Sequence, residues 1–394
     1  MKTPYCILPW VHIHTRPNGN VMPCCVYNIN SPLGNVNFNT IDEIANSKEF
    51  NNLRKLLLDH TPPKECFECV SKQTSTLETS SYRYWRMQEF KDSFEELIEN
   101  TNSDGSLKSK FTMKFMNIRY SNLCNMSCRT CGSNNSSVWA QEQNFQNPVI
   151  KITDTYPNYL KDVLERLDEV EVINFAGGES ILIPEHWTVL DKLIELKKYN
   201  VKISYVTNLS KLSYQHKNIL DYTKQLPNLM LRVSIDASHT RAEYYRNGTN
   251  WNTIEENLKI LYSNNVNMKI NCTVGATNVW HVPDLQKYLI ESNLIKPEQF
   301  SMNILIQSPV HSTKILPQYF KESVIEKIQT HKVWLNANNI DSSQWDNVIS
   351  FMLSEDHTHL LDNYIRWNLK IDKIRNQNIL DCFPELSTIF NGLP

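Results

Sequence analysis

Three cysteines are the residues of this sequence best suited to chemistry. Cys124, Cys128 and Cys131 are separated by three and then two residues. Three thiolates at this spacing fit an irregular loop wrapped around a compact, soft metal centre. Because an iron–sulfur cubane has four irons, three protein ligands leave one iron open to an exogenous ligand. The spacing predicts such a reactive cluster. Buried cysteines without a metal, or zinc with a fourth ligand from elsewhere, are the alternatives.

A second group of thiols lies near the N-terminus. It comprises Cys6, Cys24, Cys66 and Cys69. Four cysteines with no open position would close either an electron-transfer cluster or a structural zinc site. The adjacent Cys25 is interpreted as a spare, a substitute or a buried neighbour. Disulfides are not expected, because no apolar signal segment follows Met1 and cytosolic thiols stay reduced.

The elements that must position these groups alternate between strand and helix from residue 111 onward. Six strands are expected, and after the first crossover their spacing of about thirty residues is that of a βα unit. Helices are expected between them, among them Lys211–Gln225. Such a series predicts a barrel or a doubly wound sheet with its site at the strand C-terminal ends. The expected strands are Met113–Tyr120, Val170–Phe175, Lys202–Thr207, Met230–Ile235, Asn267–Val274 and Phe300–Ile306.

The first 110 residues have a different pattern. An Asn-Gly pair at 18–19 predicts a hairpin, with His12 and His14 at its surface. A capping-box signature opens a helix expected over 40–59, and a polar linker at 100–106 marks a domain boundary. Four regions are therefore predicted: a small cysteine-rich domain at 1–80, a helical bridge and linker at 81–110, the barrel at 111–310, and a helical extension at 311–394.

Length and composition bound the function classes. A chain of 394 residues with 41% hydrophobic residues predicts a packed interior and two or three domains. Lysine and arginine number 40 against 42 acidic residues, so the net charge of −2 gives no general attraction to nucleic acids or anionic membranes. Apolar runs are too short to cross a bilayer. A cytoplasmic protein is expected.

The three-cysteine loop after the first expected strand resembles the signature of the radical S-adenosylmethionine superfamily. The resemblance covers residues 111–309 and implies an α/β fold with a partial (β/α)6, TIM-like barrel. It implies that Cys124, Cys128 and Cys131 hold a [4Fe–4S] cluster whose open iron is chelated by S-adenosylmethionine. One-electron reduction in that family yields a 5′-deoxyadenosyl radical, which abstracts a hydrogen from the substrate.

Motifs after the later strands are similar to the same family. Physically, paired glycines let backbone approach a ligand closely, and a carboxylate can pair with an ammonium group. Thr130 departs from the family, in which many relatives carry an aromatic residue before the third cysteine, so the adenine contact stays unassigned. The resemblance implies six residues that bind the cofactor: Gly177, Gly178, Glu179, Asn208, Ser234 and Arg246.

The N-terminal cysteines resemble the twitch domain, the shortened relative of the SPASM domain. This resemblance implies an auxiliary [4Fe–4S] cluster on Cys6, Cys24, Cys66 and Cys69, although the domain here precedes the barrel instead of following it. The implied function is an enzyme that abstracts hydrogen from a peptide or a small metabolite, with flavodoxin or ferredoxin as reductant. A non-catalytic iron–sulfur carrier and a zinc-stabilised binding module are the alternatives.

Overall fold

The computed structural model describes residues 4–73 and 81–390 and divides into two compact units. The first unit comprises Met1–Cys124, Ser133–Tyr205 and Asp221–Leu229. The second comprises Asn125–Gly132, Val206–Leu220 and Met230–Pro394. Within the described residues, no helix combines the length and the apolar character that a membrane span requires.

The sheet of the first unit joins the N-terminal hairpin to the first βα strands. Strands β4, β5 and β6 are parallel neighbours, and β1 pairs in parallel with the free side of β4. Strands β2 and β3 follow β1 in antiparallel pairing, so the hairpin predicted from the Asn-Gly pair is confirmed. The bounds are β1 His12–Thr15, β2 Asn20–Met22, β3 Gly34–Asn35, β4 Phe115–Ile118, β5 Val172–Phe175 and β6 Lys202–Thr207.

The expectation that His12 and His14 lie at the surface is wrong. Their side chains are 0% and 1% exposed. The reason is that β1 lies between β2 and β4, where the His12 ring stacks on Phe115 of β4 at 4.1 Å and Arg86 covers Phe115 from the same face. The hairpin signal in the sequence predicts the turn but does not reveal β4, the parallel second neighbour of β1.

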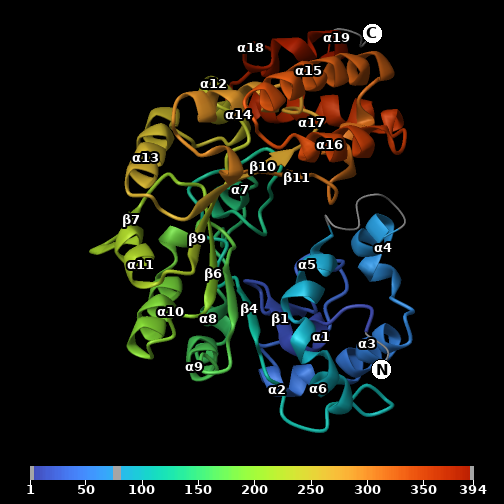
Figure 1. Ribbon diagram of the computed structural model, residues 1–394, viewed down its shortest axis with the longest axis vertical. Coiled ribbons are helices and arrows are strands. Elements are labelled where there is room, and N and C mark those ends of the chain that lie inside the picture. The colour runs from blue at the N-terminus through green and yellow to red at the C-terminus, as the bar shows by residue number, and fades with distance from the viewer. Residues whose placement is uncertain (1–3, 74–80, 391–394) are drawn as a thin grey trace. The chain divides into compact units, whose positions relative to one another are not determined.

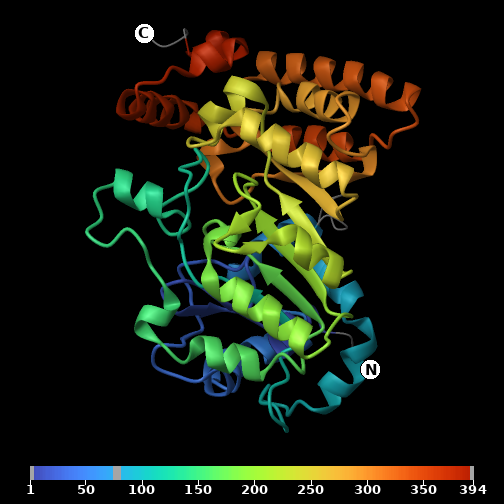
Figure 2. The same ribbon diagram turned by 90° about the vertical axis from the view of Figure 1, so that its left-hand side faces the viewer.

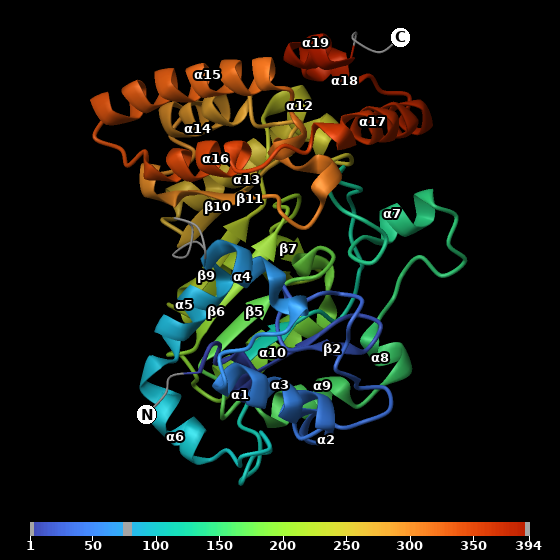
Figure 3. The same ribbon diagram turned by 90° about the vertical axis from the view of Figure 1, so that its right-hand side faces the viewer.

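Helices cover both faces of this sheet. In Figure 1, α8, α9 and α10 lie on one side of β4 and β6, and α1 and α5 lie on the other. Figure 2 shows the green helices in front of the strands, and Figure 3 shows the blue helices in front of them. The bounds are α1 Leu8–Val11, α2 Ile41–Ala45, α3 Lys48–Leu58, α4 Phe67–Gln73, α5 Tyr82–Glu89, α6 Phe94–Glu99, α7 Ser137–Glu142, α8 Ile152–Thr155, α9 Tyr159–Glu165 and α10 Pro184–Glu195.

The expected helix over 40–59 is two helices. The capping box is confirmed, because Thr40 and Glu43 bond reciprocally at the start of α2. The helix then stops, and Ser47 caps α3 by accepting the backbone N–H of Phe50 at 3.3 Å. Ser47 competes with continuation of the helix because its hydroxyl satisfies an amide that would otherwise need the preceding turn. Leu53 and Leu57 of α3 pack into the apolar core beside α1.

The second unit contains the later βα strands and the C-terminal helices. Strands β9, β10 and β11 are parallel neighbours, and with β4 to β6 all six expected strands are confirmed, several of them shorter than expected. The bounds are β9 Leu229–Val233, β10 Met268–Val274, β11 Phe300–Ile304, α12 His239–Tyr245, α13 Trp251–Ser263, α14 Val282–Glu291, α15 Gln318–Ala337, α16 Ser343–Leu353, α17 Leu361–Arg375, α18 Ile379–Cys382 and α19 Ser387–Phe390.

The helix expected over Lys211–Gln225 is wrong in its first half. That half forms a hairpin of β7 (Ser213–Tyr214) and β8 (Lys217–Asn218), and α11 occupies only Ile219–Gln225. Gln215 turns the hairpin with φ of 52°, a left-handed conformation that a helix cannot include.

Candidate functional site

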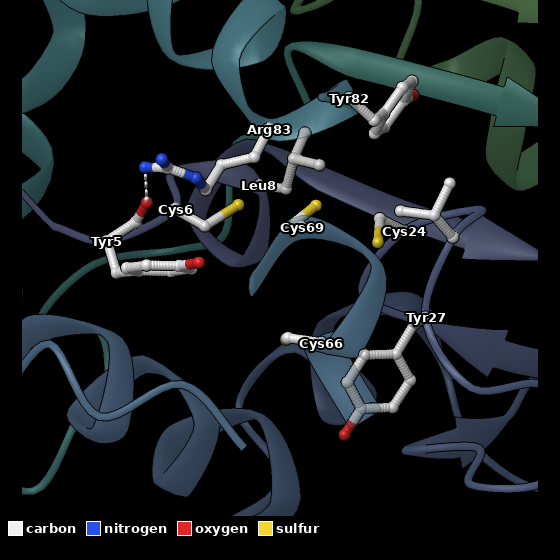
Figure 4. A pocket seen from close by; sticks show the side chains of 10 residues that line it. Tyr5, Cys6, Leu8, Cys24, Tyr27, Cys66, Cys69, Tyr82 and Arg83 are labelled. Atoms are coloured by element: carbon white, nitrogen blue, oxygen red, sulfur yellow. Dashed lines mark hydrogen bonds between the residues drawn. The ribbon is translucent and has the colours of Figure 1, made fainter. Parts of the chain in front are cut away.

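Four cysteines from three separate segments surround one cavity of the first unit (Figure 4). Cys6 precedes α1 and Cys24 follows β2, while Cys66 and Cys69 belong to a 3-10 turn and to α4. The hairpin, α1 and α4 thus bring together the four thiols that are dispersed over the first 69 residues. Mainly aromatic and apolar residues complete the lining: Tyr5, Leu8, Val26, Tyr27, Tyr82 and Arg83.

Burial makes the Cys6 and Cys66 thiols weaker acids than a thiol in water. It raises the pKa of Cys6 and of Cys66 to about 12 each, and the Cys69 thiol adds to the shift of both. A bound cationic centre favours the thiolate form and reverses this effect. Arg83 brings a positive charge to the cavity, because its Nη1 donates to the Tyr5 carbonyl oxygen at 3.0 Å. A cation there complements the negative charge of a thiolate-ligated cluster.

The donors around this cavity suit an iron–sulfur centre. Over 4–73 and 81–390, no three histidine, cysteine, aspartate or glutamate side chains converge closely enough to hold a single metal ion. Four thiols instead border a space with few polar groups. Four soft thiol donors around one cavity fit an iron–sulfur cluster.

Cys25 differs from its neighbour Cys24. It does not line the cavity, and its thiol interacts with Tyr82 and lies near Arg119. Burial raises the pKa of the Cys25 thiol, while the Arg119 charge and the Tyr82 contact oppose that shift. The two adjacent thiols therefore face different surroundings, and only Cys24 borders the space shared by Cys6, Cys66 and Cys69.

The three-cysteine loop begins at the end of the first unit's strand β4. Cys124 is the last residue of that unit before the chain enters the segment Asn125–Gly132 of the second unit. Within this segment, the Cys131 N–H donates to the Cys128 carbonyl oxygen at 3.0 Å and forms a tight turn. The backbone N–H of Arg129 donates to the Tyr245 carbonyl oxygen at 2.8 Å, which fixes the turn against the end of α12.

Arg129, between the second and third cysteines, anchors this turn. Its side chain is 1% exposed and forms an ion pair with Asp372 of α17. Its Nη2 also donates to Gln377 Oε1 at 2.9 Å, and its guanidinium lies 3.6 Å from the centre of the Tyr244 ring. Sequence reasoning missed this residue, because its partners are more than a hundred positions away and no local pattern marks them.

On the first unit's side, the paired glycines pack against the residue before Cys124. Gly178 has φ of 49°, and a Cβ there would lie 2.1 Å from the Leu123 carbonyl oxygen. The Glu179 N–H donates to the same oxygen at 2.7 Å. Only glycine permits this approach, because any Cβ would displace the backbone that leads to the first cysteine. Ser137 secures the next residue, since its Oγ accepts the Cys124 N–H at 3.1 Å.

Glu179 is a buried carboxylate with a structural bond of its own. It is 1% exposed, and its Oε1 accepts the backbone N–H of Ile181 at 3.1 Å at the start of a 3-10 turn. Buried carboxylates require such donors, since burying the charge alone is costly. The residue is therefore held in a fixed position beside the loop of Gly177 and Gly178.

Asn208 holds the cysteine loop from within the second unit. Its Nδ2 donates to Asn125 Oδ1 at 2.9 Å, and Asn125 Nδ2 donates to Ser210 Oγ at 2.9 Å. The Ser210 N–H closes the ring by donating to Asn208 Oδ1 at 2.9 Å. Asn208 thus positions Asn125, the residue that follows Cys124. The sequence resemblance assigns Asn208 to the cofactor and gives Asn125 no role.

Arg246 is paired with the aspartate of the Ser-x-Asp segment. Its Nη1 donates to Asp236 Oδ2 at 2.7 Å, and the side chains are 15% and 1% exposed. Asp236 Oδ1 accepts the Thr273 N–H at 2.6 Å, which ties the pair to β10. Ser234 is half-buried, and its N–H donates to the Thr207 carbonyl oxygen at 2.9 Å. Ser234 and Arg246 are thereby linked through one short segment after β9.

Comparison with protein families finds matches for the two segments that contain the cysteine groups. Residues 118–289 match the family model described as the radical SAM superfamily. These residues therefore form a domain of that superfamily. Residues 6–70 match SPASM, described as an iron–sulfur cluster-binding domain. The predicted family and the α/β fold class are confirmed, as are the predicted cofactors, [4Fe–4S] clusters and S-adenosylmethionine.

Solved structures of this type show only distant likeness. Native anSMEcpe with bound AdoMet has 16% identity and a TM-score of 0.36 over 54% of this chain and 61% of that one. SuiB of Streptococcus suis bound to S-adenosylmethionine has 13% identity and a TM-score of 0.39 over 75% of this chain and 63% of that one. The chain thus spans less than two thirds of the length of either structure. A comparison with curated proteins gave no match.

Proposed function

We propose that this chain is a radical S-adenosylmethionine enzyme in which Cys124, Cys128 and Cys131 bind the reactive [4Fe–4S] cluster. The observation that carries the proposal is the position of the paired glycines. Gly178 is packed so closely against Leu123 that the glycine loop and the first cysteine form one local structure. In this superfamily, the cluster and S-adenosylmethionine together supply a radical that takes hydrogen from carbon.

The remaining proposed cofactor contacts are Gly177, Gly178, Glu179, Asn208, Ser234 and Arg246. Two of these side chains are held in place by other groups of the protein. Glu179 accepts a backbone N–H, and Arg246 pairs with Asp236. Prior orientation lowers the entropic cost of holding a ligand. Asn208 has a second task, because it also positions Asn125 of the cysteine loop.

The N-terminal site is proposed to hold the auxiliary [4Fe–4S] cluster through Cys6, Cys24, Cys66 and Cys69. The cavity that these four residues line, together with the matched iron–sulfur family, supports this assignment. Such a cluster would pass electrons or help to position substrate. We place the domains at 1–80, 81–110, 111–310 and 311–394, although β1 also extends the sheet of the first unit.

The proposed reaction is hydrogen abstraction from a carbon atom of a peptide or a small metabolite. The proposed electron donor is a one-electron reductant such as flavodoxin or ferredoxin. A cytoplasmic setting is proposed as well, because two thiol-rich sites require a reducing compartment.

The test uses protein purified without oxygen, reduced with dithionite and supplied with S-adenosylmethionine. A deuterated extract of peptides and metabolites serves as the substrate pool. We expect 5′-deoxyadenosine to form and to gain one mass unit in at least one fraction. If 5′-deoxyadenosine forms but contains no deuterium in any fraction, hydrogen abstraction from these substrates is contradicted. Absence of 5′-deoxyadenosine despite full iron content would leave an iron–sulfur carrier as the function.

A further inference from the structure

A row of polar side chains crosses one face of the sheet in the first unit. His14 of β1 is in register with Asn117 of β4, and Asn117 is in register with Asn174 of β5. Residues in register point to the same side of a sheet. Asn174 Nδ2 lies 3.4 Å from Asn117 Oδ1, which confirms that the two amides meet on that face.

The opposite face is apolar and covered by helices. It carries the alternate residues of the same strands, including Ile13, Met116 and Ile173, which are at most 3% exposed. Helix α10 covers this face, because the His186 ring lies 4.8 Å from that of Phe175. The polar row therefore lies on the other face of the sheet, on the side of α1 and α5 (Figure 1). In a sheet of βα units, the side without the crossover helices is the interior side, and ligands bind at the C-terminal ends of its strands.

Two arginines form the next row toward the C-terminal ends of these strands. Arg16 follows His14 by two residues and Arg119 follows Asn117 by two, and both lie near the His14 ring, because their charges help to lower its pKa. Burial lowers the pKa of Arg16 to about 10, and the positive charge of Arg119 contributes to that shift. The two guanidinium groups are thus close enough to repel. In the part of the chain that the structure describes, neither forms an ion pair with a carboxylate, and Arg16 Nη2 donates to Asn135 Oδ1 at 3.5 Å.

The same place has buried polar atoms without partners. His14 is 1% exposed and interacts with the Asn117 side chain, but among the described residues neither of its ring nitrogens has a hydrogen bond of full geometry. The Nδ2 of Asn117 and the Nε of Arg119 are also buried without one. Each such atom costs free energy unless an incoming group satisfies it. Three adjacent side chains with unsatisfied buried polar atoms indicate a ligand-binding site rather than a packed core.

The position separates this cluster from the cofactor sites. Arg16, Arg119 and His14 do not line the cavity of the four N-terminal cysteines. Arg119 does lie next to the glycine loop, because a Cβ on Gly177 would be 3.0 Å from the Arg119 Cβ. A group bound by the arginines would consequently lie beside the loop that we propose for S-adenosylmethionine.

We propose that Arg16 and Arg119, with His14 and Asn117, bind a carboxylate group of the substrate. The planar fork of a guanidinium matches the two oxygens of a carboxylate, and two forks compensate its charge where no protein carboxylate does. The amides of Asn117 and Asn174 provide donors and acceptors for an adjoining peptide-like group. The substrate is then a carboxylic acid such as an amino acid or an acidic peptide. Carboxylate binding by these residues is independent of the proposed function. That the carboxylate belongs to the substrate rests on that function.

The probe for this site is succinate, with phosphate and chloride at equal ionic strength as comparisons. The protein is the cluster-loaded full chain, kept without oxygen, and the readout is the anion-dependent rise in Tm together with calorimetric titration. We expect succinate to bind, and R16Q and R119Q to weaken its binding at least tenfold. The matched control is R366Q, because Arg366 is a highly exposed arginine of α17. Equal succinate binding by wild type and both variants would overturn the proposal, as would tighter binding of phosphate.

A second readout detects a purely structural role. Because Arg119 has no carboxylate partner within 4–73 and 81–390, R119M should leave the Tm of the anion-free protein unchanged or raise it. A clear loss of Tm in R119M would mean that the arginine stabilises the fold and would overturn the proposal. Binding of S-adenosylmethionine and iron content are measured on the same samples. Loss of S-adenosylmethionine binding in R119Q would assign the arginine to the cofactor instead. Failure of the wild type to form 5′-deoxyadenosine would count against the proposed function, while the succinate titration still decides this inference.

Discussion

Arg129 and Asp372 form a buried ion pair that ties the three-cysteine loop to α17. Their side chains are 1% and 7% exposed, so neither charge is compensated by solvent. Asp372 has further donors in the Tyr244 hydroxyl, at 2.9 Å, and the Ile379 N–H, at 2.8 Å. The second and third cysteines are therefore positioned by a network that extends almost to the C-terminus of the chain.

Replacement of Arg129 by methionine should destabilise the protein. Removal of one partner leaves the buried Asp372 carboxylate without its counter-charge, which costs roughly 3–5 kcal/mol of unfolding free energy. The control is R366M on α17, whose ion pair with Asp362 is exposed and should contribute about 1 kcal/mol or less. Urea denaturation of both variants measures the difference. Equal stability of R129M and R366M would show that the network does not hold the loop.

Gly178 should not tolerate alanine. A Cβ would lie 2.1 Å from the Leu123 carbonyl oxygen, and φ of 49° adds backbone strain. G178A should therefore displace the residues leading to Cys124 and lose iron from the reactive cluster. The matched control is G132A, because a Cβ on Gly132 meets no atom within 4 Å. Iron analysis after anaerobic reconstitution compares them, and full iron content in G178A would contradict the proposed role of the glycine loop.

The two adjacent N-terminal thiols should behave differently. Cys24 lines the cavity with the other three cysteines and Cys25 does not. C24S should lose the auxiliary cluster, about four irons per chain, whereas C25S should keep it. Iron and sulfide analysis of the two variants provides the measurement. Loss of these irons in C25S alone would exchange the two assignments.

Sequence pattern predicted the regular parts of the molecule and missed its long-range contacts. The six strands follow from apolar runs at βα spacing, a local signal that parallel packing reinforces. The burial of His14 escaped prediction because it depends on β4 pairing with β1 from about one hundred residues away. For the same reason the cysteines could be named from their spacing, but the residues that hold them, Arg129 and Asn125, could not. Ser47 shows the local limit, since a single hydroxyl ends one helix and starts another.

Acid should destabilise the protein through its buried histidines. Burial lowers the pKa of His186 to about 3, so the folded state keeps this ring neutral while the unfolded chain takes up a proton below pH 6.5. The stability supplied by the neutral ring is present above pH 6.5 and is lost as pH falls toward 3. Between pH 7 and 5 this one residue should cost about 2 kcal/mol of unfolding free energy. H186F should show a smaller loss over that interval by urea denaturation, and an unchanged loss would contradict the assignment.

The central claim is that Cys124, Cys128 and Cys131 hold a reactive cluster distinct from the N-terminal one. The most direct measurement is 5′-deoxyadenosine release after dithionite reduction in the presence of S-adenosylmethionine, with iron counted on the same samples. Wild type should contain about eight irons per chain and release the nucleoside. The triple variant C124A/C128A/C131A should keep about four irons and release none. The account would be contradicted if the triple variant released 5′-deoxyadenosine, or if a wild type with about eight irons released none.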